Sequence, residues 1–196
     1  DKAPFPLELP TPITNFQVTE KVLSKLVMVP SVCLSQIQGR VLRDAYFPWC
    51  LALFDRKPPS LTNAAMEISF RFFIWILSST FYDAIPLHSK SRLFEITHEN
   101  LQSRSSQLPI DLLSLVIDLS TSLFPFLTPP QQCSIIRAYD QLSAKSDITS
   151  SSSSNSSSLP LPFILKAIEK ISPHIKNSPQ ISELYIMIVG ILNKGL

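Results

Sequence analysis

The stretch PPSLTNAAMEISFRFFIWILSSTFYDAIP, residues 58–86, shows how the whole chain is organised. Prolines open and close it, and the residues between them carry apolar side chains at helical spacing. Proline disrupts a helix interior but fits the first turn, where its missing N–H has no helical partner in any case. The sequence therefore predicts a helix over residues 61–84, the longest in the chain, capped by Ser60. Its segment Phe70 to Leu77 has no consistent polar face, which predicts a central helix covered on several sides.

Prolines border apolar stretches in the same way along the rest of the chain, which has 17 prolines and only 3 glycines. Apolar stretches of helical period lie between the prolines, and no window alternates with the period of two that is typical of a half-buried strand. Pro48 is expected to kink or end a helix capped by Ser35, with Trp49 to Phe54 as a short apolar turn. The pattern predicts an all-α fold of about eight or nine helices, stacked as antiparallel pairs in a HEAT- or armadillo-like α-solenoid.

Four segments follow from this pattern. Residues 1–13 are predicted to form an extended, proline-rich lead-in, and residues 14–143 a helical-repeat region with helix caps at Ser89 and Thr128. Residues 144–159 are predicted to form a serine-rich disordered loop, because they cannot bury enough apolar surface to offset their ordering entropy. Residues 160–196 are predicted to form a helical pair on the same stack. The last helix should bury Ile181, Leu184, Tyr185, Ile188 and Leu192.

Composition narrows the classes of function. Hydrophobic residues make up 45% of the chain and charged residues 16%, with a formal net charge of +2. A nearly neutral chain argues against nucleic acid as the primary partner. The most apolar run, Phe72 to Tyr82, is shorter than the roughly 20 residues of a membrane span, so no membrane partner is predicted. Cys33, Cys50 and Cys133 form no C-x-x-C pair, which favours reduced core cysteines in an intracellular protein.

The chain shows no signature of a catalytic, cofactor or metal site. Its three histidines lack metal-ligand spacing, and three glycines cannot build a phosphate-binding loop. Two small basic groups, Arg40 with Arg43 and Lys166 with Lys170, are candidate partner-binding residues for an acidic protein or a phosphate backbone. The alternative for both groups is an ordinary solvated helix face.

One region resembles a known family. Val22-Leu23-Ser24-Lys25-Leu26, Leu34-Ser35, Arg40-Val41-Leu42 and Tyr46-Phe47-Pro48-Trp49-Cys50-Leu51-Ala52-Leu53 are similar to part of the C-terminal helical-repeat domain of the Fanconi anaemia group E protein. In that family a Tyr-Pro-x-Cys-x-Ala-Leu stretch closes one helical unit. Here Phe47 stands between the tyrosine and the proline, and the alignment needs a gap before Tyr46. The resemblance implies a non-enzymatic nuclear scaffold in DNA crosslink repair, bridging the group C protein and the group D2 substrate.

The sequence thus favours a non-enzymatic scaffold for protein–protein interaction, a subunit of a larger intracellular complex. Two alternatives remain open at this point. One is an enzyme whose site forms only in the folded chain, with His98 or His174 beside a carboxylate or a cysteine. The other is a weak nucleic-acid-binding module that uses the lysines near the C-terminus, including Lys166 and Lys170.

Overall fold

A computed structural model describes residues 36–55, 62–79, 82–149, 161–175 and 181–194. These residues form helices and no strand, which confirms the predicted all-α class. The chain divides into two compact units, residues 1–93 and 94–196, and each is described by itself. The predicted lead-in at residues 1–13, residues 14–35 of the predicted helical-repeat region, and the serine tract at residues 150–158 lie outside the described residues.

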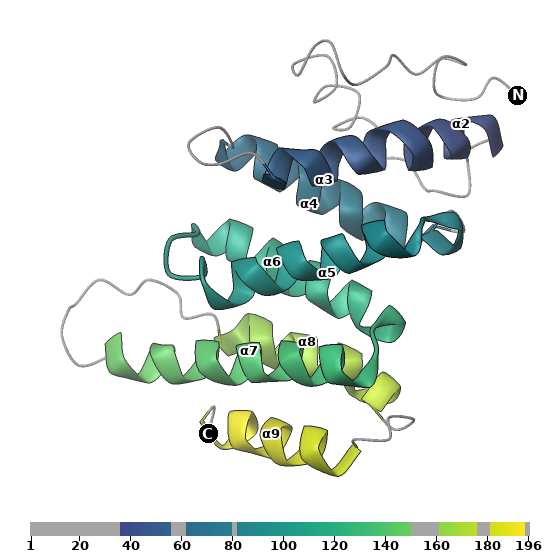
Figure 1. The fold of residues 1–196 in the computed structure, drawn as a ribbon. Helices are drawn as coiled ribbons and strands as arrows, with labels where there is room; N and C mark the ends of the chain where they lie inside the picture. Colours follow the sequence, from purple (N-terminus) through teal and green to yellow (C-terminus); the bar gives the residue numbers. More distant parts are fainter. Residues whose placement is uncertain (1–35, 56–61, 80–81, 150–160, 176–180, 195–196) are drawn as a thin grey trace, which may run out of the picture. The chain divides into compact units, whose positions relative to one another are not determined.

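The first unit begins with one continuous helical segment. It comprises α2 (Gln36–Val41), a π-helical turn η2 (Leu42–Tyr46) and α3 (Phe47–Asp55) (Figure 1). The helix therefore does not end at Pro48, and the separate apolar turn predicted for Trp49 to Phe54 is wrong. Proline has no N–H to offer the carbonyl four residues before it, and the wider π-turn absorbs this loss. Its bonds span five residues, with the Phe47 N–H donating to the Leu42 carbonyl oxygen.

Helix α4 (Asn63–Leu77) is shorter than predicted. It begins after Thr62, whose Oγ1 accepts a hydrogen bond from the Ala65 N–H at 3.2 Å, as an N-cap side chain does. It ends at Leu77, and just beyond that end Ser78 Oγ donates to the Trp75 carbonyl oxygen and Ser79 Oγ to the Ile76 carbonyl oxygen. A short 3₁₀ turn, η3 (Tyr82–Ala84), follows separately.

The segment Phe70 to Leu77 is buried on most of its circumference, as its pattern predicts. Only Arg71 is exposed, and Ile74 is half-buried. Helix α3 covers one side of α4 with aromatic contacts: the ring centroids of Phe47 and Phe73 lie 5.5 Å apart, and those of Phe54 and Phe70 lie 5.3 Å apart. Such pairs add to the free energy gained from the area that they bury.

Helix α5 (Leu87–Gln102) spans the division between the two units. It starts two residues before Ser89, which was expected to cap it. The Pro86 carbonyl oxygen accepts hydrogen bonds from the N–H groups of Ser89 and Lys90, so helical bonding begins at the proline.

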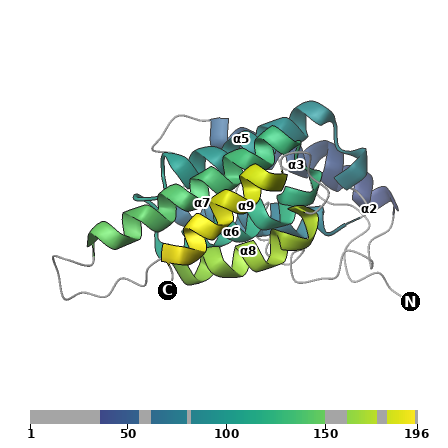
Figure 2. The same cartoon turned by 90° about the horizontal axis from the view of Figure 1, so that it is seen from below.

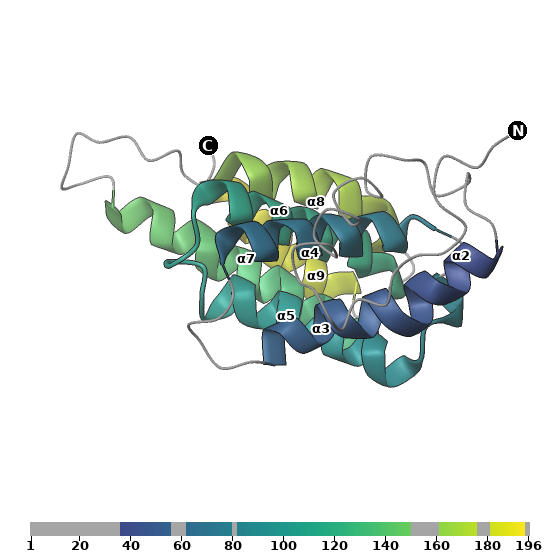
Figure 3. The same ribbon diagram turned by 90° about the horizontal axis from the view of Figure 1, so that it is seen from above.

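The second unit continues with α6 (Ile110–Leu123), the 3₁₀ turn η4 (Phe124–Phe126), α7 (Pro129–Thr149), α8 (Leu161–Ile175) and α9 (Ile181–Lys194). Helices α6 to α9 run in alternating directions (Figure 1). Helix α7 packs on α8 and α9, and Figure 2 shows α9 against both. Helix α6 packs on α8, beside which it lies in Figure 3. Each of α8 and α9 therefore contacts the helix before it and the helix two places before it.

The start of α7 agrees with the sequence prediction, but its end does not. Helix α7 starts at Pro129 as predicted, and Thr128 donates from its N–H and its hydroxyl to Gln131 Oε1. It then runs to Thr149, so residues 144–149 are helical and not part of the predicted serine-rich loop. Ala144 and Lys145 are strong helix formers, and they carry the helix up to the serine tract.

Phe73→Ala is expected to lower the free energy of unfolding by about 3–5 kcal/mol, because it removes a fully buried ring that contacts α3. Urea unfolding followed by circular dichroism measures the loss. Arg71→Ala on the exposed side of the same helix is the matched control and should change stability by less than about 1 kcal/mol. Equal losses for both variants would show that α4 is not packed as described.

Candidate functional site

The outer face of α9 is apolar and exposed. Leu184, Ile188 and Ile191 are buried against the rest of the second unit. Four other apolar side chains of the helix reach solvent, and we call them the α9 stripe: Tyr185 is 40% exposed, Ile186 74%, Val189 52% and Leu192 42%.

Helical geometry makes these four residues one surface. Tyr185, Val189 and Leu192 follow the i, i+4, i+7 spacing that places side chains on one face, and Ile186 lies beside them. Gly190 borders the stripe, and a β-carbon at that position would meet no atom within 4 Å. A contiguous exposed patch of this kind is unusual on a monomeric protein and marks a binding surface more often than isolated apolar residues do.

Sequence reasoning placed two residues of the stripe on the wrong side. Tyr185 and Leu192 were predicted to be buried with Leu184 and Ile188, but they lie at the edge of the exposed face. The sequence does carry a signal: no charged residue stands between Glu183 and Lys194. A helix that is apolar all round has to be covered on several sides, and here the described residues cover only one.

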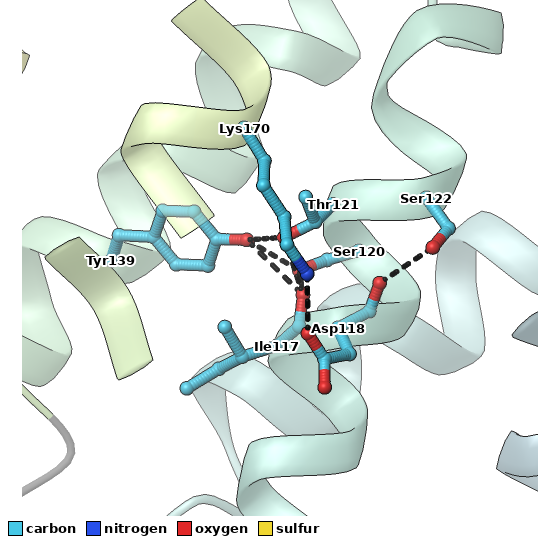
Figure 4. Close-up of polar contacts among 7 residues, drawn as sticks. All are labelled: Ile117, Asp118, Ser120, Thr121, Ser122, Tyr139 and Lys170. Carbon is cyan, nitrogen blue, oxygen red and sulfur yellow. Dashed lines mark hydrogen bonds and ion pairs between the residues drawn. The ribbon is translucent and has the colours of Figure 1, made fainter. Parts of the chain in front are cut away.

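Helix α9 packs on α7, and hydrogen bonds of a buried tyrosine hold α7 against α6. The buried Tyr139 hydroxyl lies 2.6 Å from Ser120 Oγ, 3.4 Å from Thr121 Oγ1 and 3.5 Å from the Ile117 carbonyl oxygen (Figure 4). Ser120 Oγ and Thr121 Oγ1 both donate to that same carbonyl oxygen. The Tyr139 hydroxyl is therefore left to donate to Ser120 Oγ, which ties α7 to one turn of α6.

Two exposed ion pairs join other helices of this unit. Lys170 Nζ on α8 lies 3.3 Å from Asp118 Oδ1 on α6, beside the Tyr139 contacts (Figure 4). Arg137 on α7 pairs with Glu183 in the first turn of α9. Exposed pairs of this kind contribute little stability, but they mark which faces of the helices meet.

The predicted basic residues are partly neutralised. Arg43 Nη2 donates to Asp44 Oδ2 at 2.8 Å, and this hydrogen bond lowers the pKa of Asp44. Lys170 is paired with Asp118. Arg40 and Lys166 are exposed, and neither has an ion pair with another described residue. Arg40 and Arg43 belong to the first unit, and the two lysines belong to the second.

The two histidines and the two described cysteines that the sequence offers to an enzyme lie in different surroundings. His98 stacks on Phe94 at 5.5 Å between ring centroids, its Nε2 has no hydrogen-bond partner, and burial lowers its pKa. His174 is exposed. Burial raises the pKa of the Cys50 thiol, and it also raises that of Cys133. Thiols with raised pKa values are poor nucleophiles.

Two further findings concern the described residues only. No group of three or more histidine, cysteine, aspartate or glutamate side chains among them is arranged to hold a metal ion. None of their helices combines the length and the apolar character that crossing a membrane requires.

Comparison of the chain with models of known protein families, with curated proteins and with solved structures finds no match.

Tyr139→Phe is expected to destabilise the protein by about 1–2 kcal/mol, since it removes the buried hydroxyl and its hydrogen bond to Ser120. Denaturant unfolding measures the change. Tyr185→Phe removes the same group from the exposed α9 stripe and should alter stability by less than about 0.5 kcal/mol. If the two variants were equally stable, the contacts of Tyr139 would not fix α7 on α6.

Alkaline pH is expected to destabilise the fold through its buried tyrosines. Burial raises the pKa of Tyr46, Tyr82 and Tyr139 to about 12 each, whereas an unfolded tyrosine ionises near pH 10. Between these values the unfolded chain releases protons that the folded chain retains, so the free energy of unfolding falls as pH rises. Urea midpoints from about pH 8 to about pH 11 measure the fall, which should be shallower in Tyr139→Phe. A constant midpoint above pH 10 would contradict it.

Proposed function

We propose that the chain is a non-enzymatic scaffold for protein–protein interaction, built as an α-solenoid of about eight or nine helices in antiparallel pairs. The packing of the second unit supports the solenoid. Helix α8 contacts α7 and α6, and α9 contacts α8 and α7. Contacts with the preceding helix and with the helix two places before are those of a two-layer stack. Such stacks expose long surfaces that bind partners.

The observation that carries the proposal is the α9 stripe. Four apolar side chains lie exposed on one helix, next to a face that is already packed against α7 and α8. Leaving this surface in water costs free energy that a protein partner would recover by covering it.

The chemistry of the buried groups supports a non-enzymatic role. Cys50 and Cys133 have raised pKa values, and His98 Nε2 bonds to no carboxylate or thiol. In an enzyme, a general base or a nucleophile has an activating partner within hydrogen-bond distance, and a nucleophilic thiol has a lowered pKa.

We further propose that the protein is an intracellular subunit of a larger complex and that it acts in the nucleus in DNA repair. The proposal of a nuclear repair role rests on the resemblance of residues 22–53 to the C-terminal domain of the Fanconi anaemia group E protein. Arg40, Arg43, Lys166 and Lys170 are proposed to lie at secondary contacts with acidic partners. Arg40 and Lys166 are the stronger candidates, because Asp44 and Asp118 neutralise the other two.

The test is capture of protein partners by the full chain and by Ile186→Asp, which places a charge in the middle of the α9 stripe. Proteins recovered from cell extract are identified and then measured again as purified partners. We expect Ile186→Asp to weaken binding by at least about tenfold, because a buried unpaired carboxylate costs more than 1.4 kcal/mol.

Leu87→Asp is the matched control, since Leu87 is 79% exposed and lies on α5 in the other unit. It should bind as the unchanged chain does. The proposal fails if no purified partner binds, or if the Leu87 and Ile186 variants bind equally.

A further inference from the structure

We draw no further inference here: the strongest candidate, the exposed apolar face of α9 formed by Tyr185, Ile186, Val189 and Leu192, belongs to the surface on which the proposed function already rests, and nothing in the described part of the chain shows what covers it.

Discussion

The buried hydroxyl of Tyr139 fixes the position of α7 against α6 in the second unit. A buried hydroxyl without a partner is costly, so the phenol must meet acceptors at one level of the neighbouring helix. Those acceptors belong to Ile117, Ser120 and Thr121 on a single turn of α6. Once α7 is held at this turn, α8 packs on both α6 and α7, and α9 packs on α7 and α8. Apolar burial supplies most of the free energy, whereas the hydroxyl contacts set the register.

Two apolar helices of this chain meet different surroundings. In α4, aromatic rings of α3 cover the segment Phe70 to Leu77, and only Arg71 is left in water. In α9, one side is buried and the α9 stripe is exposed. The difference follows from position, because α9 has described neighbours only on the side of α7 and α8. A surface of exposed apolar side chains therefore arises from the same kind of sequence that elsewhere builds the core.

The basic residues are less available to a partner than their spacing suggests. Asp44 and Asp118 each hold one member of the two basic groups, Arg43 and Lys170. Because an aspartate neutralises one residue of each group, neither group forms a continuous basic patch. The net charge of the chain, +2, is also low. Specific binding by this protein is thus more readily explained by apolar contact than by electrostatic attraction.

The sequence by itself determined the all-helical class, the start of α7 at Pro129 and the burial of Phe70 to Leu77, because proline geometry and side-chain periodicity act within a few residues. It could not determine that the helix runs on through Pro48, since the π-turn of residues 42–46 is a compensation that periodicity does not encode. Nor could it determine which side of α9 stays exposed: an all-round apolar helix has no preferred face of its own. Only the tertiary structure decided that Leu184 and Ile188 turn inward while Ile186 and Val189 meet solvent, because α7 and α8 offer packing surface on one side alone.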